Sequence, residues 1–366
     1  MSCTSYLQLS VTQQGDELKL TWSGSRFSFS PYCVNAKRVR DASLEVRTVL
    51  DSITSEYKSS PSPDYRGFLK ALARAGEKLN AALFFAESGS AERIKNLIPT
   101  LSPRTPLNIF TDGFVQVPWS FVFGGDVREL PDPRGALDDF RGFWTEMFKI
   151  RIRFNQMQSM PCDKPISKRS IRALYALHDQ HFNSARRQLK SDINIDKKLA
   201  KVLELPVGET TDWEDCREKW GEIIDNDSIL YIFGHSDGER LFLNEVPAST
   251  RSDKYTLDTN DFVVLFQKGK TTRSNTLCFI NGCRSADGSL GDGFLSVTSG
   301  VGFHGFIGAE AEVSNTFATQ YAAEFLYGIL EEGLSVEDIF EQLRVQHFPL
   351  SLLYSCFADP GFQVAE

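Results

Sequence analysis

Two short, almost wholly apolar segments in the second half of the chain constrain its fold most. Residues 228–233 (SILYIF) and 276–280 (TLCFI) are shorter than ordinary helices and lack the alternation of a half-exposed strand. Apolar runs of this length are typical of strands in a parallel sheet, because helices cover both faces of such a sheet. Further apolar runs at 171–177 and 301–307 alternate with helical patterns. This alternation predicts an α/β fold whose mainly parallel sheet is flanked by helices.

The first part of the chain has a different pattern. Residues 6–12 and 17–22 alternate apolar and polar side chains around a Gln-Gln-Gly-Asp turn, which predicts a β-hairpin. Apolar stripes at helical spacing follow in 42–57 and 65–85. Residues 107–110 and 114–123 are then strand-like, with a Pro-Trp dipeptide at 118–119. Together these features predict an N-terminal α+β half.

A polar segment separates the two patterns. Residues 156–170 (QMQSMPCDKPISKRS) hold two prolines and show no periodicity, so we expect a linker there. The predicted organisation is therefore an N-terminal half at 1–155, the linker at 156–170 and a C-terminal α/β half at 171–366.

Charge and cysteine usage exclude several classes of protein. The net charge is −8 and no long basic stripe is present, which disfavours a nucleic-acid partner. No apolar stretch approaches the roughly 18 residues that a membrane helix needs, and the first residues lack the apolar core of a signal peptide. The seven cysteines form no Cys-x-x-Cys pair, which argues against a disulfide framework or a zinc site. We expect a cytoplasmic protein with free thiols, no metal, no cofactor and no membrane partner.

Two of the predicted strands lead directly into reactive side chains. Residues 228–233 are followed by Gly-His-Ser-Asp-Gly, which carries His235, and 276–280 by Asn-Gly-Cys, which carries Cys283. Sites in open parallel sheets form beyond the carboxyl ends of the strands. If the two strands are neighbours, an imidazole and a thiol meet at one edge of the sheet.

Such a pair has a defined chemistry. A nearby imidazole converts a weakly nucleophilic thiol into a thiolate, and acyl transfer also needs donors for the oxyanion. Gly238, Gly282 and the backbone N–H of Cys283 are the candidates for that cleft. Taken singly, a cysteine after a strand is more often a small core residue, and a histidine there is more often structural. The pairing of the two at successive strand ends is what favours a catalytic dyad.

A second motif overlaps the first. Residues 234–238 also match Gly-x-Ser-x-Gly, the nucleophile elbow of α/β-hydrolases, which would make Ser236 the nucleophile, with Asp292 and either His304 or His347 as its partners. An elbow requires a helix directly after the serine, whereas the residues that follow here predict a short strand. The serine hydrolase remains an alternative, as does an inactive module that only binds peptides.

At these residues the chain resembles the CHAT peptidases, relatives of caspases and separase within clan CD. The resemblance covers the C-terminal half and rests on YIFGHSDG (231–238), CFINGCRSADG (278–288), GVGFHGFIGAEAEVSN (300–315) and the final Phe-Ala-Asp-Pro (357–360). Residues 106–123 resemble the Pro-Trp strand pair that precedes the family's catalytic half. The chain departs from the usual Gly-His-Gly and Asn-Ala-Cys, and it has Arg284 where an acidic residue is common.

The resemblance implies a caspase-like fold and a cysteine endopeptidase in which His235 is the base and Cys283 the nucleophile. It also implies that Glu310, Glu312 or Asp287 lines the S1 pocket and selects a basic residue before the cut. Family members often act in triggered bacterial defence or cell death, as zymogens that a sensor or an upstream protease activates. The implied partner is a protein or peptide substrate, such as a gasdermin or another defence protein.

Overall fold

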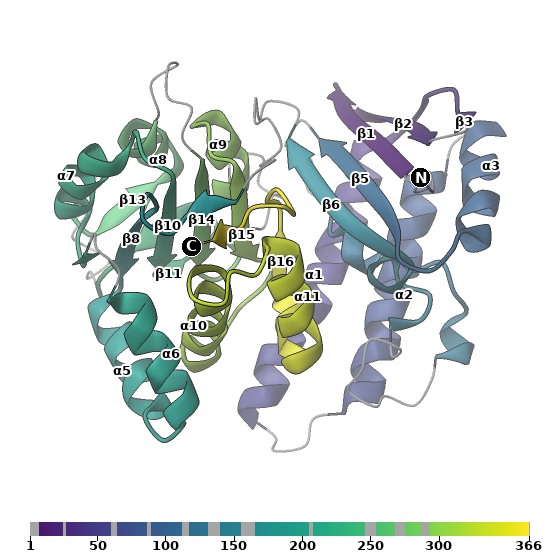
Figure 1. Cartoon of the computed structure of the whole chain (residues 1–366). Coiled ribbons are helices and arrows are strands. Elements are labelled where there is room, and N and C mark those ends of the chain that lie inside the picture. Colours follow the sequence, from purple (N-terminus) through teal and green to yellow (C-terminus); the bar gives the residue numbers. More distant parts are fainter. Residues whose placement is uncertain are drawn as a thin grey trace. The chain divides into compact units, whose positions relative to one another are not determined.

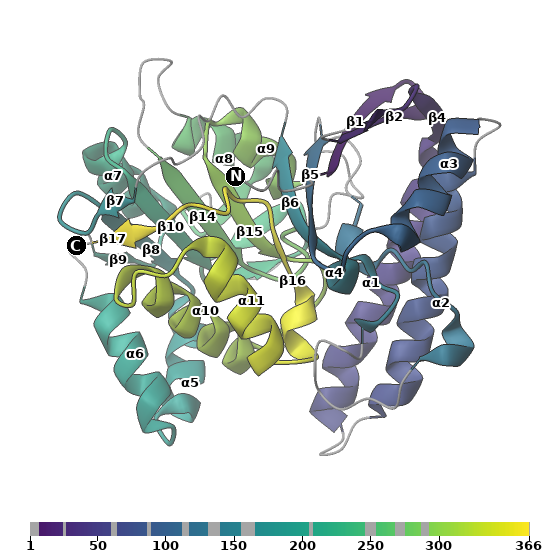
Figure 2. The ribbon, with the colours of Figure 1, turned by 45° about the vertical axis from the view of Figure 1, so that its right-hand side comes forward.

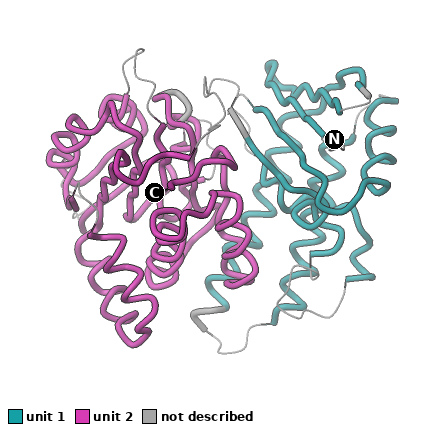
Figure 3. The backbone as a smooth tube through the Cα atoms, in the orientation of Figure 1, with its two compact units in different colours: residues 1–155 teal, residues 156–366 magenta. Residues whose placement is uncertain are grey.

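The computed structural model divides the chain into two compact units, 1–155 and 156–366, which Figure 3 shows in different colours. The structure describes residues 7–24, 27–59, 64–85, 89–111, 117–130, 140–154, 165–204, 208–245, 254–267, 275–286 and 293–365.

Unit 1 is built on a mixed sheet with strand order β3-β2-β1-β5-β6, and β4 also pairs with β2. Its strands are β1 (Leu7–Gln14), β2 (Glu17–Gly24), β3 (Phe27–Ser28), β4 (Tyr32–Asn35), β5 (Thr105–Thr111) and β6 (Phe148–Phe154). The predicted hairpin is confirmed, because β1 and β2 pair antiparallel around Gly15, whose φ of 61° suits a glycine. β5 pairs parallel with both β1 and β6.

Two long helices supply most of the helical part of unit 1. They are α1 (Ala36–Ser59) and α2 (Tyr65–Phe84), where the sequence predicted helices, and the shorter helices are α3 (Gly89–Leu97), η1 (Ile98–Thr100), η3 (Val127–Glu129) and α4 (Trp144–Met147). Of the two strands predicted around Pro-Trp, the first corresponds to β5, whereas the second, at 114–123, is wrong because Trp119–Phe121 form a 3₁₀ helix, η2. A Cβ at Gly76 of α2 would lie 2.2 Å from the carbonyl oxygen of Phe121. The absence of a side chain at Gly76 therefore lets this turn pack closely against α2. In the same turn, the buried ring of Trp119 stacks on that of Trp144.

Unit 2 contains the predicted parallel sheet, with strand order β16-β15-β14-β10-β8-β9. These strands are β8 (Arg172–Leu177), β9 (Glu209–Thr210), β10 (Ser228–Phe233), β14 (Thr276–Asn281), β15 (Gly305–Ala309) and β16 (Tyr354–Cys356). Only β16 runs antiparallel to its neighbour. The strand predicted at 301–307 starts later, at Gly305, because Val301 still makes a helical hydrogen bond to the carbonyl oxygen of Val297.

Helices cover both faces of this sheet (Figures 1 and 2). One group is α5 (Asp179–Leu189), α6 (Ile193–Leu203), α10 (Asn315–Leu330) and α11 (Val336–Gln346), and the other is α7 (Trp213–Ile223), α8 (Thr259–Phe266) and α9 (Phe294–Gly300). Every residue of β10, β14 and β15 is consequently buried. The α/β fold with a mainly parallel, helix-flanked sheet is thus confirmed.

Two small sheets complete unit 2. β11 (His235–Ser236), β12 (Arg240–Phe242) and β13 (Thr256–Asp258) form a three-stranded antiparallel sheet just beyond β10. β7 (Ile166–Ser167) pairs parallel with β17 (Val364–Ala365), near the end of the chain. Part of the segment expected to be a linker is therefore a strand, and 156–164 lie outside the described residues.

Candidate active site

The ends of β10 and β14 bring the two candidate reactive residues to one edge of the sheet. The strands are adjacent and parallel, with Ser228 opposite Thr276 at one end and Phe233 opposite Asn281 at the other. The hydroxyls of Ser228 and Thr276 are 2.8 Å apart, which ties the amino ends together. His235 and Cys283 each follow two residues after the last pair, so they leave the sheet at the same level.

Glycines allow the two loops to touch where the strands end. A Cβ added at Gly282 would lie 3.0 Å from Cβ of Ser236 and 3.2 Å from the carbonyl oxygen of Gly234. A Cβ at Gly234 would lie 2.7 Å from the carbonyl oxygen of Phe242, which is closer than real Cβ atoms come. The His and Cys loops therefore run against each other, and larger residues would push them apart.

His235 is exposed and its backbone is held in the small antiparallel sheet. It is the first residue of β11 and pairs with Phe242 of β12, and the two ring centroids are 6.0 Å apart. The turn after β11 is fixed by Asp237, whose Oδ1 accepts from the backbone N–H groups of Glu239 (3.1 Å) and Arg240 (2.8 Å). This is the Asx arrangement that aspartate favours in turns.

Gly238, a predicted oxyanion residue, lies in that same turn. Its φ is 94°, a conformation that glycine adopts without strain. Its backbone N–H already donates to Oγ of Ser236 at 3.0 Å. This hydrogen bond to Ser236 would have to break before the N–H of Gly238 could donate to an oxyanion.

Cys283 is half-buried, and its Sγ lies 3.8 Å from the carbonyl oxygen of Val313. Asn281, two residues earlier, anchors this strand end. Its side-chain amide donates to the carbonyl oxygen of Ala318 (2.6 Å), and its Oδ1 accepts from the hydroxyl of Tyr354 (2.6 Å). The amide is also within 3.2 Å of the hydroxyl of Tyr231. Because these groups are buried, the network fixes the strand end that carries the thiol.

The turn after Cys283 is equally constrained. Arg284 has a φ of 55°, an uncommon conformation for a residue with a side chain, and its N–H donates to the carbonyl oxygen of Ala311 at 3.2 Å. The buried hydroxyl of Ser285 donates to the carbonyl oxygen of Ile280 (2.8 Å) and accepts from the N–H of Ala309 (2.9 Å). The chain therefore turns sharply away from the sulfur and leaves it at the edge of the sheet.

The other described cysteines of unit 2 have thiols suited to the core. Burial raises the pKa of the Cys216 and Cys278 thiols well above the ordinary value, and it raises the pKa of Cys356 to about 12. A buried thiol of this kind carries almost no thiolate at neutral pH. Cys283 and Cys356 are both half-buried, but Cys356 belongs to the antiparallel strand β16, whereas Cys283 lies just beyond the carboxyl end of the parallel strand β14.

The three predicted S1 residues have different environments. Glu310 follows β15 directly and is only 1% exposed, and its backbone N–H donates to the carbonyl oxygen of Leu353 at 2.8 Å. Glu312 is exposed. Asp287 lies outside the described residues.

The serine hydrolase alternative does not fit the structure. Ser236 is 3% exposed, it belongs to β11, and the strand β12 follows it instead of the helix that an elbow requires. The N–H of His304 donates to Thr276 at the opposite end of β14. Nε2 of His347 is bonded to Glu324 on a neighbouring helix. Asp292 lies outside the described residues.

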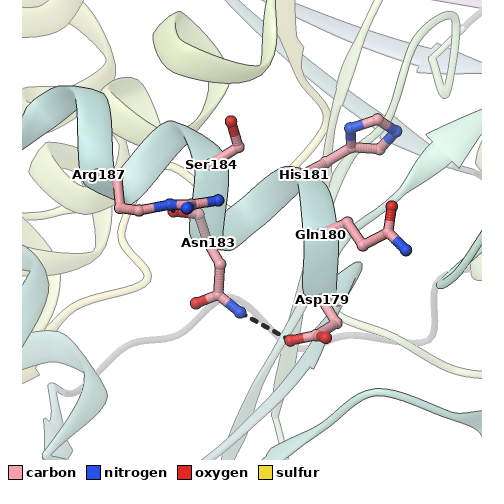
Figure 4. A pocket seen from close by; sticks show the side chains of 6 residues that line it. All are labelled: Asp179, Gln180, His181, Asn183, Ser184 and Arg187. Carbon is pink, nitrogen blue, oxygen red and sulfur yellow. Dashed lines mark hydrogen bonds between the residues drawn. The ribbon is translucent and has the colours of Figure 1, made fainter.

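A pair of histidines, which the sequence analysis missed, lies at the same edge of the sheet as His235 and Cys283. His178 directly follows β8 and caps α5, and its ring centroid is 4.1 Å from that of His181. His181 also lines a hollow along α5 with Asp179, Gln180, Asn183, Ser184 and Arg187 (Figure 4). The signal was available, because His178 follows an apolar strand in the same way as His235.

The described part of the chain shows neither a metal-binding cluster nor a membrane-spanning helix. No group of three or more His, Cys, Asp or Glu residues there could hold a metal ion. The helices there include none whose length and apolarity would let it cross a membrane.

Comparisons with known proteins point to one fold. No protein-family model matches the sequence, and a search of curated proteins also finds no match. Two crystal structures of the separase–securin complex from Saccharomyces cerevisiae are similar to this chain, with TM-scores of 0.52 and 0.53 and sequence identities of 9% and 10%. They match 99% and 98% of this chain but only 30% of the separase chain. The chain thus has a separase-like, caspase-like fold and spans about a third of the length of these structural neighbours.

Proposed function

We propose that this chain is a cysteine endopeptidase with His235 as the general base and Cys283 as the nucleophile. The observation that carries the proposal is the register of β10 and β14, which are parallel neighbours that end at the same level. Each strand is followed, at the same distance, by one member of the dyad. The partial exposure of Cys283 and the exposure of His235 support access for a substrate at this edge.

The proposed reaction is acyl transfer to sulfur. His235 takes the thiol proton, and the Cys283 sulfur attacks the carbonyl carbon of the scissile peptide bond. The backbone N–H of Cys283 is the proposed first donor to the oxyanion. The imidazolium then protonates the leaving amine as the C–N bond breaks. Water, deprotonated by His235, hydrolyses the thioester and releases the carboxylic acid and the thiol.

The loop after β15 suggests a specificity for this enzyme. Glu310 and Glu312 follow the strand next to β14, and we propose that one of them forms the base of an S1 pocket, with Asp287 as a further candidate. A carboxylate there would pair with arginine or lysine at P1. The buried Glu310 is the better placed of the two described residues, because a desolvated carboxylate discriminates more strongly between charged and neutral side chains.

The wider setting is also a proposal. The motifs resemble those of CHAT peptidases, and the solved neighbours contain a protein partner, securin. We infer a protein substrate, such as a gasdermin or another defence protein, cleaved in the cytoplasm after a sensor or an upstream protease activates the chain.

The test compares the purified wild-type chain with Cys283→Ala and His235→Ala on a proteome-derived peptide library. We expect cleavage by the wild type and a loss of about a thousandfold or more in each variant, because the two residues act as a unit. Cys33→Ala is the matched control, since Cys33 is an exposed thiol in unit 1 and its removal should leave cleavage unchanged.

A thiol-reactive peptide probe separates the peptidase from its main rival. The proposed enzyme should be labelled at Cys283 and lose the label in Cys283→Ala. An inactive peptide-binding module would bind library peptides with neither cleavage nor labelling at this position, and that result would end the proposal.

A further inference from the structure

We propose that His178 is a positioning residue for the base His235, and that it acts together with His181 and Glu245. This inference rests on the proposed function. The observation behind it is a connected array of side chains that runs along the edge of the sheet, from the end of β8 to the segment after β12.

The backbone of His178 ties β8 to the strand that leads to His235. In the sheet, Leu177 of β8 pairs with Phe233 of β10. The N–H of His178 continues this pairing by donating to the carbonyl oxygen of Phe233 at 2.7 Å. The bond lies two residues before His235, so His178 restrains the backbone from which the base projects.

The ring of His178 is held in one orientation. The side chain is 1% exposed, and its Nδ1 accepts from the backbone N–H of His181 at 3.4 Å. Its ring also lies against the ring of His181, with an angle of 39° between the planes. Because Nδ1 is the acceptor, the proton of the neutral ring is assigned to Nε2.

At its other end, the array reaches Glu245, which follows the small sheet that carries His235. Nε2 of His181 lies 3.5 Å from Oε1 of Glu245. Glu245 closely follows β12, whose residue Phe242 pairs with His235. Figure 4 shows His181 on the first turn of α5, at the opposite end of the hollow from Arg187. The contact between His181 and Glu245 thereby links the first turn of α5 to the segment that follows the sheet bearing the base.

The charge state of His178 suits a residue that lies near the base His235. Burial, with smaller effects of the nearby His181 and His235, lowers the pKa of His178 to about 4, against opposing effects of a backbone hydrogen bond and of Asp179. His178 therefore stays neutral at neutral pH. A neutral ring does not repel the imidazolium that forms on His235 when the thiol proton moves, whereas a charged neighbour would.

A purely structural role for His178, as the cap of α5, is the alternative. His178→Asn distinguishes the two roles, because asparagine is among the best capping residues and its side-chain oxygen can accept the same N–H. The variant keeps the helix cap and removes the ring. His181→Asn is a second variant on a less buried residue, which keeps the donating N–H and removes both the ring contact and the pair with Glu245.

The experiment measures how fast iodoacetamide alkylates Cys283 at pH 7 in the full chain, followed by peptide mass mapping. This readout reports the thiolate that His235 promotes and does not depend on a substrate. We expect roughly tenfold slower alkylation in His178→Asn and a smaller slowing in His181→Asn, because a misplaced base stabilises the thiolate less. His304→Asn, at the other end of β14, should react as the wild type does.

The outcomes separate this proposal from the proposed function. If His235→Ala slows alkylation but His178→Asn and His181→Asn match His304→Asn, the positioning role is rejected and the dyad stands. If His235→Ala itself reacts like the wild type, the dyad fails and the positioning role fails with it. Should His178→Asn not fold, the rate of His181→Asn decides.

Discussion

The sheets of the two units differ in how many of their faces are covered. In unit 1, β1 and β5 alternate buried and half-exposed residues, so Leu9 faces the core while its neighbour Ser10 does not. In unit 2, β10 and β14 are buried at every position. A sheet with helices on both faces leaves only its ends open to a ligand. That difference explains why the candidate chemistry gathers at the carboxyl ends of β10 and β14.

The largest expected effect is a loss of stability on substitutions that test this difference in burial directly. Ile229→Ala and Leu230→Ala, at adjacent positions of β10, should each lower the free energy of unfolding by about 2–5 kcal/mol, because both side chains are 0% exposed. In β1, Leu9→Ala should cost a similar amount, whereas Ser10→Ala should change stability by less than about 0.5 kcal/mol.

Urea unfolding followed by a probe in each unit measures these four variants. Tryptophan fluorescence suits the purpose in backgrounds that keep the tryptophans of one unit only, which are Trp22, Trp119 and Trp144 in unit 1 and Trp213 and Trp220 in unit 2. A cost at only one of the two β10 positions would mean that one face of the unit 2 sheet is less well packed than its burial indicates.

The second largest expected effect is a difference between the two units in how much stability they lose at acid pH. All five histidines lie between His178 and His347, in unit 2. Burial lowers the pKa of His178 to about 4, below the value of about 6.5 in an unfolded chain. The unfolded state therefore binds a proton first as the pH falls from about 6.5 to 4, and unit 2 loses up to about 3 kcal/mol across this window.

His178→Asn removes that titration and isolates its contribution. Between pH 7 and pH 4 the variant should lose less stability in unit 2 than the wild type does, while unit 1 should respond equally in both. Unfolding curves at several pH values check this. Identical pH dependence in the two proteins would contradict a neutral, buried His178.

Sequence patterns predicted the sheet of unit 2 well because its strands are buried on both faces. Residues 228–233 and 276–280 could be recognised without any long-range information, and they are followed directly by Gly-His and by Asn-Gly-Cys. The fold class and the hairpin near the N-terminus followed from the same kind of local pattern.

The parts that could not be predicted depend on contacts between distant residues. The residues after Pro118 form a turn and not a strand, because Gly76 of α2 lets Phe121 approach closely. Nothing in the sequence around Asn281 indicates that it forms hydrogen bonds with Ala318 and Tyr354, which are 37 and 73 residues away. The position of His178 after an apolar strand was visible in the sequence, but its contact with His181, and that of His181 with Glu245, exist only in the folded chain.

The smallest expected effect concerns the anchor of the Cys283 loop. Tyr354 is fully buried, stacks on Tyr321 at a centroid distance of 4.2 Å, and donates its hydroxyl to Oδ1 of Asn281 at 2.6 Å. Tyr354→Phe keeps the stacked ring and removes only the donor, which leaves one buried acceptor unsatisfied. We expect a loss of about 1–2 kcal/mol in unit 2. Tyr327→Phe, on the half-exposed side of α10, is the matched control and should be close to neutral.

The same substitution separates support of the fold from support of the site. If the network of Asn281 only stabilises unit 2, Tyr354→Phe should lower the unfolding midpoint and leave the alkylation rate of Cys283 at 25 °C unchanged. We expect both to change, because Asn281 lies two residues before the thiol and its amide is held by α10 as well as by β16. An unchanged alkylation rate would show that the sharp turn at Arg284 and Ser285 fixes the cysteine without help from β16.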